Sequence, residues 1–326
     1  MTKIVINKGV AGLGNRLITA AAAIEYAISN NRALLVDWSD GVYSEKGKNI
    51  FHQYFSIKDI AQIASLEEIE EQTLTYYPPK YKNKLKTDIY SLYRAKESWL
   101  LQKSNRFNPK GTFGKLLGYW QSIENFKTNI KDIDAILALF RKNDFPYGGF
   151  LNNRKEDVVI FSDFYPKYDG KILRHHIALK DNIKSKIEHF QKTNNLSKGV
   201  VGVHVRNTDK TPTAPLSQLF EKINKITKKS SAIFLATDSI EIELEFKKRY
   251  TTIIMHPKNY PPQKNIGTHH YAIRTGDYSS AEQLLEASII DMYLLSKCDY
   301  LIYQKNSSFS EVSAALKAEP ERTLYW

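Results

Sequence analysis

The feature that most constrains the fold is a regular alternation of strand-like and helix-like segments after Gly199. Short β-branched or apolar runs alternate with longer stretches in which apolar residues recur at helical spacing. This alternation is typical of a parallel sheet that is covered by helices. We expect strands at 200–205, 232–236, 252–255 and 300–303, and helices at 216–226, 239–246, 281–297 and 308–316. The second half of the chain is therefore predicted to form a Rossmann-like domain.

The first half begins in the same way. We expect strands at 3–7, 33–37 and 157–161, and helices at 15–29 and 181–191. A length of 326 residues fits two domains of ordinary size. The predicted fold is therefore α/β, with Rossmann-like domains at residues 1–195 and 196–326. Residues 40–150 carry a mixed pattern from which we predict no element.

The formal net charge of +12 calls for an anionic partner. Nucleic acid, an anionic membrane surface and phosphate-bearing small molecules all satisfy that requirement. No nucleic-acid-binding module is recognisable, although a basic nucleic-acid binder stays an alternative. The basic run at 80–86 and the acidic run at 67–71 are interpreted as solvated faces.

The single cysteine, Cys298, forms no internal disulfide and has no companion for a Cys-based zinc site. That usage indicates a reducing compartment, so we expect a cytoplasmic protein. The apolar start of the chain is too short for a signal peptide, and no stretch approaches the roughly 20 apolar residues of a membrane helix. A basic surface would suit acceptors at the inner face of an anionic membrane, as a peripheral association.

The first motif is a glycine turn at residues 9–17, between a strand and a helix. Backbone N–H groups at Gly12, Gly14 and Asn15 can bind an anion, and Arg16 can add a full positive charge. The alternative is a tight turn that needs glycine only for packing. A dinucleotide site is a more remote alternative. It is suggested by Asp37, which lies where an acidic residue binds the ribose in such folds. A leucine replaces the third glycine of that fingerprint, which argues against an NAD-dependent oxidoreductase.

The second motif is the strand 200–205 with the residues that follow it. His204 and Arg206 alternate with valines, so they share one side of the strand and face the edge at which parallel sheets bind ligands. Arg206 can bind a diphosphate in a bidentate manner and neutralise charge on a leaving nucleotide. The alternative is that Arg206 forms an ion pair with Asp209 and that His204 is a hydrogen-bonded core residue.

Two further motifs follow later strands and helices. Asp238 comes after the strand 232–236 and can accept a hydrogen bond from a sugar hydroxyl. Ser239 is a further candidate for donor binding, although it more simply caps the next helix. Asp291 lies among apolar neighbours on the helix 281–297, which we expect Ser280 to cap. Guanine would compensate that buried carboxylate, because its ring N–H and exocyclic amine are adjacent donors. An exposed aspartate on the wet face is the alternative. Ser307, Ser308 and Phe309 begin the last helix, whose hydroxyls and N–H groups suit phosphate.

Together these motifs resemble the nodulation protein Z family and, more distantly, the animal core α-1,6-fucosyltransferases. The resemblance rests on Gly12-Leu13-Gly14, Val36-Asp37-Trp38, Gly202-Val203-His204-Val205-Arg206, Thr237-Asp238-Ser239 and Asp291-Met292-Tyr293-Leu294-Leu295, with the serines beyond. It implies a GT-B fold, with the acceptor chiefly on the first domain and GDP-fucose chiefly on the second. It also implies inverting transfer without an essential metal or cofactor. The Gly-Leu-Gly-Asn and His-x-Arg patterns are similar to α-1,2-fucosyltransferases as well, and transfer of another sugar from a GDP donor is a further alternative.

The resemblance also implies roles for single residues. Arg206 would hold the donor diphosphate with His204 beside it, and Asp291 would read guanine. Ser307 and Ser308 would approach the phosphates, and Asp238 would border the sugar. The animal enzymes have a glutamate as proposed general base where this chain has Ala214. Inversion needs a group that takes the acceptor proton, and Asp209 is our candidate.

Overall fold

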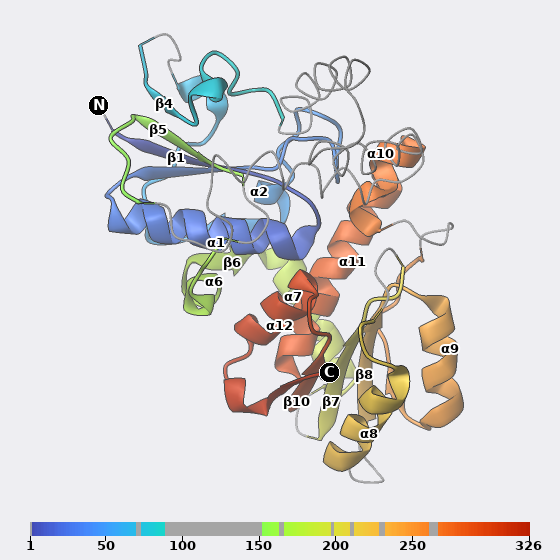
Figure 1. The fold of residues 1–326 in the computed structure, drawn as a ribbon. Coiled ribbons are helices and arrows are strands. Elements are labelled where there is room, and N and C mark those ends of the chain that lie inside the picture. Colours follow the sequence, from blue (N-terminus) through green and yellow to red (C-terminus); the bar gives the residue numbers. More distant parts are fainter. Residues whose placement is uncertain are drawn as a thin grey trace, which may run out of the picture.

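The computed structural model describes residues 2–69, 73–88, 152–162, 166–196, 199–208, 212–227, 232–260 and 267–326. Within these ranges two parallel sheets carry the architecture (Figure 1). The first has the order β2-β1-β5-β4 and comprises β1 (Ile4–Lys8), β2 (Ala33–Asp37), β4 (Tyr76–Tyr77) and β5 (Val158–Phe161). The second has the order β11-β10-β7-β8-β9 and comprises β7 (Val200–Val205), β8 (Ala232–Thr237), β9 (Ile253–Ile254), β10 (Tyr300–Tyr303) and β11 (Thr323–Tyr325). The short strands β3 (Phe55–Ile57) and β6 (Ile177–Leu179) pair antiparallel.

Helices cover both faces of the second sheet. The longer helices of the chain are α1 (Leu13–Ser29), α7 (Asp181–Thr193), α8 (Leu216–Ile226), α9 (Ile240–Arg249), α11 (Tyr278–Lys297) and α12 (Ser308–Leu316). Shorter ones are α2 (Phe51–Tyr54), α6 (Gly170–His176) and α10 (Tyr271–Thr275). Val201, Val203 and Val205 of β7 pack towards α8 and α9, whereas Val200 faces the core that α11 and α12 share. Continuous burial along β1, β2 and β7 explains why these strands are apolar at nearly every position.

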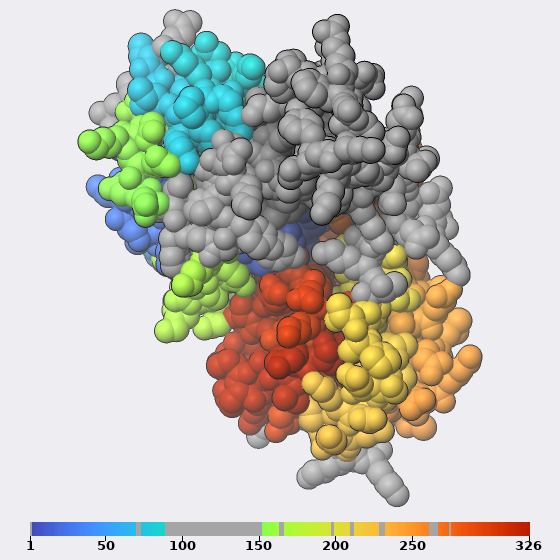
Figure 2. Space-filling model, in the orientation of Figure 1, coloured from blue at the N-terminus to red at the C-terminus, as the bar shows by residue number. Residues whose placement is uncertain are grey.

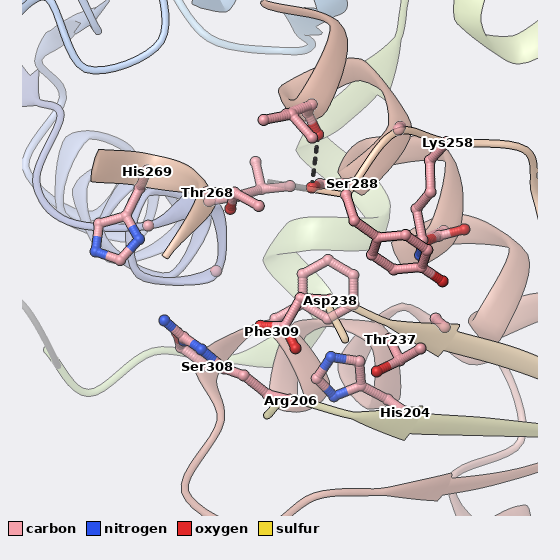
Figure 3. A pocket seen from close by; sticks show the side chains of 18 of the residues that line it. His204, Arg206, Thr237, Asp238, Lys258, Thr268, His269, Ser288, Ser308 and Phe309 are labelled. Carbon is pink, nitrogen blue, oxygen red and sulfur yellow. Dashed lines mark hydrogen bonds and ion pairs between the residues drawn. The ribbon is translucent and has the colours of Figure 1, made fainter. Parts of the chain in front are cut away.

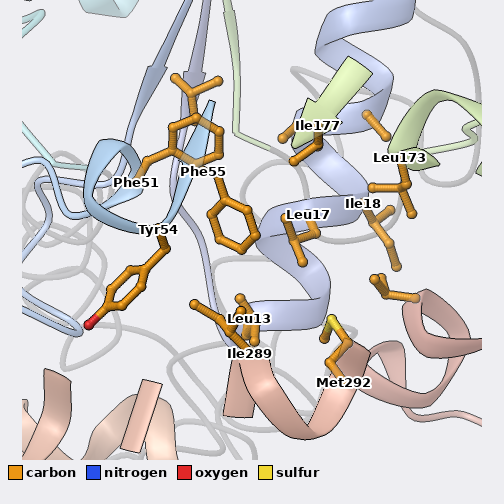
Figure 4. Close-up of a cluster of buried hydrophobic side chains, with 14 of the residues drawn as sticks. Leu13, Leu17, Ile18, Phe51, Tyr54, Phe55, Leu173, Ile177, Ile289 and Met292 are labelled. Carbon is orange, nitrogen blue, oxygen red and sulfur yellow. The ribbon is translucent and has the colours of Figure 1, made fainter. Parts of the chain in front are cut away.

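One apolar core joins the two halves of the chain. Leu13 and Leu17 of α1 meet Ile289 and Met292 of α11 in a single buried cluster (Figure 4). Full burial of such a side chain contributes about 1.5–3 kcal/mol. In Figure 2 the lobe of the C-terminal residues, coloured yellow to red, adjoins residues of the first half, and α12 contacts both α1 and α6. α7 precedes residue 196 but packs on α11 of the second half. The domain boundary at 195/196 therefore stays a prediction.

The sequence predicted most of these elements. The predictions for β2, β7, β10, α8 and α12 are confirmed residue for residue, and the other predicted elements differ by one to three residues at their ends. The start of α11 was predicted wrongly. The helix begins at Tyr278, because Asp277 and not Ser280 is the capping residue, and its carboxylate accepts from the Ser280 N–H at 3.0 Å. β11 was not predicted, nor was the β3–β6 pair.

None of the described helices has the length and apolar character that crossing a membrane requires.

Candidate functional site

A pocket lies at the carboxyl ends of β7 and β8, where open α/β sheets place their ligands. It encloses about 760 Å³ of space, open solvent included. The start of α1, the start of α12, one face of α11 and two connecting segments close it. The described lining residues are Gly12, Leu13, Gly14, His204, Arg206, Ala236, Thr237, Asp238, Lys258, Asn259, Tyr260, Thr268, His269, Leu284, Ala287, Ser288, Asp291, Ser308 and Phe309. Figure 3 shows Arg206 and Lys258 on opposite sides of this pocket.

Arg206 follows directly on β7 and lines the pocket beside the first half of the chain. Its backbone N–H donates to Gln304 Oε1 at 2.7 Å, which fixes the chain at the strand end. Burial raises the pKa of Tyr43 to about 12, and the positive charges of Arg16 and Arg206 oppose that rise. Tyr43 belongs to the first half of the chain, so the guanidinium of Arg206 lies close enough to the junction of the two halves to act on it.

His204 is almost fully buried, with 6% of its surface exposed. Its ring stacks on Phe309 with centroids 4.6 Å apart, and its Nδ1 lies 2.5 Å from Ser310 Oγ. Burial, with help from the charges of Arg206 and Lys258, lowers the pKa of His204 to about 3, so the imidazole is neutral. Ser310 Oγ already accepts the Gln304 N–H at 3.2 Å, so its hydroxyl hydrogen is available for Nδ1. A hydroxyl that donates to Nδ1 leaves the ring hydrogen of the neutral imidazole on Nε2, as a donor.

Asp238 ties together the loops that follow β7 and β8. Its carboxylate accepts from the Asn207 N–H at 2.7 Å and from Thr208 Oγ1 at 2.6 Å. Ser239 occupies the N-cap position of α9, as we predicted, but its side chain makes no capping hydrogen bond and does not line the pocket. The assignment of Ser239 to donor binding is therefore not supported by its position, whereas Asp238 does line the pocket.

Asp291 is buried, with 3% of its surface exposed, so the alternative of an exposed aspartate is excluded. Its Oδ2 accepts a hydrogen bond from Lys258 Nζ. Its Oδ1 has no hydrogen-bond partner among the described residues, and His256 Nδ1 lies 3.9 Å from it. Lys258 is a site residue that sequence reasoning missed. It lies in an irregular segment without a periodic pattern. Its contact with Asp291 joins distant parts of the chain and cannot be predicted from the local sequence.

The glycine turn brings α1 against the start of α12. A Cβ on Gly14 would lie closer than 3.0 Å to backbone atoms of Ser308 and Phe309, so this glycine is required for packing. Ser308 Oγ donates to Asn15 Oδ1 across the same contact. Gly12 and Gly14 line the pocket, whereas Asn15 is buried beside it.

The position of Arg16 gives no support to the expectation that it binds an anion, because Arg16 does not line the pocket. Its side chain is fully buried, pairs with Asp40 at 2.6 Å and donates from Nε to the Ala11 carbonyl at 2.9 Å. Its guanidinium also lies over the rings of Trp38 and Tyr43. The sequence could not reveal this, because the partner carboxylate follows 24 residues later.

Asp37 is likewise committed elsewhere in the fold. Its carboxylate pairs with the buried Lys8 ammonium at 2.5 Å and accepts from Ser39 Oγ at 2.5 Å. Neither Asp37 nor Lys8 lines the pocket. The ribose-binding role of the dinucleotide alternative therefore has no support in the position of this residue.

The first turn of α12 reaches the pocket through Ser308 and Phe309. Ser307 is the N-cap residue, but it is buried and does not line the pocket. The N-terminal N–H groups of α12 offer partial positive charge there. Of the three residues predicted at this position, two lie at the pocket and Ser307 lies behind it.

His269 and Thr268 line the side of the pocket next to Gly12, and sequence reasoning missed both. The His269 ring lies 3.5 Å from where a Cβ of Gly12 would be, and it packs on His270 at 3.7 Å between centroids. Asp209, the candidate base, lies outside the described residues. Ala214, at the position of the family glutamate, is half-buried against the core of β7, α8 and α9. In the described ranges no cluster of three or more His, Cys, Asp or Glu side chains is placed to hold a metal ion.

Comparison with known proteins finds similarity to the Nodulation protein Z family. Residues 166–320 match the family described as Nodulation protein Z (NodZ). The Nodulation protein Z of Azorhizobium caulinodans is 24% identical over 94% of this chain and 87% of that protein. The Nodulation protein Z of Bradyrhizobium diazoefficiens is 22% identical over 94% and 77%.

Solved structures agree in fold. The structure of the fucosyltransferase NodZ from Bradyrhizobium superposes with a TM-score of 0.59 at 16% identity, covering 97% of this chain and 94% of that one. A structure of NodZ α-1,6-fucosyltransferase soaked with GDP-fucose gives the same TM-score and identity, covering 97% and 93%. The resemblance predicted from the sequence and the GT-B architecture are confirmed.

Proposed function

From the match of residues 166–320 to the Nodulation protein Z family, we propose that this chain is a fucosyltransferase that uses GDP-fucose as donor. One observation carries the proposal: a single pocket has the permanent cation of Arg206 on one side and, across it, Lys258, which donates to the buried carboxylate of Asp291. A guanosine diphosphate has complementary groups at its two ends. Relatives that carry the family name include a NodZ structure soaked with GDP-fucose and one co-crystallised with GDP.

The base of the donor would lie at Asp291. Guanine presents its ring N–H and its exocyclic amine side by side, and Asp291 Oδ1 is a buried acceptor without a hydrogen-bond partner in the described part of the chain. An unsatisfied buried carboxylate oxygen costs free energy that a ligand donor recovers. Asp291 therefore favours a base that offers donors on its Watson–Crick edge.

The diphosphate would lie between Arg206 and the start of α12. Arg206 donates several N–H groups in a fixed fork that matches phosphate oxygens, and the helix N-terminus adds partial positive charge. The neutral His204 would donate from Nε2 on the same side of the pocket. As the bond between fucose C1 and the phosphate oxygen breaks, negative charge develops on GDP, and these donors stabilise it in place.

We propose inverting transfer with α-1,6 linkage and without an essential metal or cofactor, to a hydroxyl of an oligosaccharide or glycolipid. The acceptor oxygen would attack C1 from the face opposite GDP while a base takes its proton, and Asp209 stays our candidate for that base. Asp238 would border the fucose. The first half of the chain would carry the acceptor, in the cytoplasm, with the net charge of +12 favouring association with an anionic membrane face.

Donor binding gives the first test. GDP-fucose should raise the melting temperature of the protein more than GDP-mannose does, and NAD should leave it unchanged. A ligand at 100 times its Kd stabilises the native state by about 2.7 kcal/mol. Failure of both GDP-fucose and GDP to shift the transition would refute the proposal, and equal shifts with GDP-mannose would leave the sugar unassigned to fucose.

Turnover gives the second test. Release of GDP from GDP-fucose with a glycan acceptor should persist in EDTA. Arg206→Ala should lower the rate by about 10²–10³-fold, the cost of one transition-state donor, without changing the unfolding transition. Arg322→Ala is the matched control, because Arg322 is exposed and pairs with Asp299 outside the pocket. Near-normal turnover by Arg206→Ala would remove the assigned role of that guanidinium.

A further inference from the structure

Lys258 lies directly at the group that would read the nucleotide base. Its ammonium donates to Asp291 Oδ2, and 11% of its side chain is exposed. Both residues line the pocket. The other carboxylate oxygen, Oδ1, is buried without a hydrogen-bond partner among the described residues. The pair therefore presents a cationic donor beside an unsatisfied acceptor.

The segment that carries Lys258 is held on both sides. The His256 ring packs edge-on against Phe190 of α7, with centroids 5.6 Å apart. Tyr260 donates its hydroxyl hydrogen to Glu243 of α9 at 2.6 Å. These two contacts fix the chain before and after Lys258, so its position against Asp291 belongs to the fold and does not depend on an exposed, flexible side chain.

A donor beside an acceptor matches one edge of guanine. O6 of guanine accepts, and the adjacent N1–H and 2-amine donate. We propose that Lys258 is a specificity-determining residue that donates to guanine O6 while it stays paired with Asp291, whose Oδ1 accepts from N1–H and the 2-amine. This inference rests on the proposed function, because it concerns the base of the GDP donor.

The same geometry rejects adenine. Adenine carries an amine where guanine carries O6, so its donor would face the Lys258 ammonium, and its unprotonated N1 would face the Asp291 carboxylate. Two donors would meet, and two acceptors would meet, at a buried aspartate and a lysine whose side chain is only 11% exposed. Leaving buried polar groups unpaired in this way costs more free energy than one hydrogen bond contributes on average. Such sites therefore discriminate strongly between bases.

The competing role for Lys258 is that of a counter-ion that guanine displaces. In that case the lysine would oppose binding, and its removal would strengthen it. His204 is a second competitor for O6, because it lines the same pocket and its ring can carry a donor. Both competitors predict that a variant without the ammonium keeps its preference for an oxygen at position 6 of the base.

Titration calorimetry with GDP, 6-thio-GDP, IDP and ADP separates these roles. Sulfur is a weak acceptor, so 6-thio-GDP tests the contact to O6, and IDP lacks the 2-amine that Asp291 would bind. Lys258→Met should weaken GDP binding about 10-fold or more, the scale of a hydrogen bond from a charged donor. It should also bind GDP and 6-thio-GDP equally, while the penalty for IDP persists.

Two further variants control the experiment. Lys258→Arg keeps a cationic donor and should retain the preference for GDP over 6-thio-GDP. Lys48→Met removes an exposed lysine that pairs with Glu282, also on α11 but outside the pocket, and should leave all four affinities unchanged.

Each outcome decides the matter. Unchanged or tighter GDP binding by Lys258→Met, or a retained preference for GDP over 6-thio-GDP, would overturn the role of Lys258 while leaving the proposed function intact. Absence of GDP binding by the native protein would instead remove the proposed function and this inference with it. If Lys258→Met fails to fold, equal affinities of the native protein for GDP and 6-thio-GDP would still refute the contact.

Discussion

Gly14→Ala is the substitution for which the structure and local helix chemistry predict opposite results. Alanine is favoured over glycine in helices by about 1 kcal/mol, so propensity alone predicts a more stable protein. The new Cβ, however, would lie closer than 3.0 Å to backbone atoms of Ser308 and Phe309. Backbone atoms at the start of a helix have no rotamer with which to move aside, so α1 and α12 must separate.

The cost follows from that separation. Restoring ordinary contact requires a shift of up to about 1 Å, which forfeits a quarter to a half of the dispersion energy along the interface. Overpacking of this kind costs about 3 kcal/mol at the upper end of its usual range. After the gain in propensity, Gly14→Ala should lose about 2 kcal/mol of unfolding free energy. Because Ser308 and Phe309 line the pocket, GDP should also bind less tightly.

Urea denaturation of the native protein, Gly14→Ala and Gly12→Ala tests this reasoning. Gly12 has its nearest neighbour, His269 Nδ1, at an ordinary 3.5 Å from the added Cβ. It is the N-cap residue of α1, where replacement by alanine costs at most about 1 kcal/mol. Gly14→Ala should therefore be the less stable of the two. A Gly14→Ala variant as stable as the native protein would refute the close contact between α1 and α12.

Two other predictions concern buried charges. The pKa of His204 lies at about 3 in the folded protein and at about 6.5 when exposed, so unfolding takes up a proton. The free energy of unfolding that the buried, neutral His204 contributes is complete above about pH 6.5. It is lost as the pH falls towards 3, by up to about 1.4 kcal/mol per pH unit. His204→Gln should flatten the dependence of unfolding free energy on pH between about pH 6 and pH 4, and an unchanged slope would contradict the buried neutral imidazole. Asp37→Asn should cost about 3–5 kcal/mol, because it leaves the buried Lys8 charge without its partner. Asp299→Asn, which breaks an exposed pair, should cost less than about 1 kcal/mol, and equal losses in thermal unfolding would argue against the buried pair.

The sequence predicted the sheet-forming segments well, because a strand that is buried on both faces has a recognisable run of apolar residues. β7 and β10 are short apolar runs between polar residues, and their ends were predicted correctly. β11 has no such apolar run, since Leu324 and Tyr325 are exposed and the strand is defined by its pairing with β10. The helix cap at Asp277 was missed for a related reason, as several residues near the start of α11 have capping side chains and only the fold selects one.

The candidate site divides in the same way. His204 lies near the end of β7, and Arg206 and Asp238 directly follow β7 and β8. The carboxyl ends of these strands share one edge, so topology alone brought the three residues together. The ion pair of Arg16 was not foreseen, because its partner Asp40 belongs to another segment. Lys258 was missed because it lies in an irregular segment, and His269 because it lies in a 3-10 helix of only three residues, Thr268–His270, which has no periodic pattern. Side chains whose position depends on contacts between distant segments lay beyond what local patterns reveal.

The first turn of α12 links these contacts to one another. Ser308 donates to Asn15 of α1, and Phe309 stacks on His204 of β7, so the junction of the two halves and the donor pocket share the same two residues. A movement that separated α1 from α12 would take Gly12 and Gly14 out of the pocket wall and remove the packing that limits the motion of Phe309 against His204. A donor that fills the pocket contacts residues of both halves and is expected to oppose that separation, because a ligand stabilises the arrangement to which it binds. The glycine turn therefore allows the two halves of the chain to meet at the pocket, and the binding of an anion by its N–H groups stays a prediction.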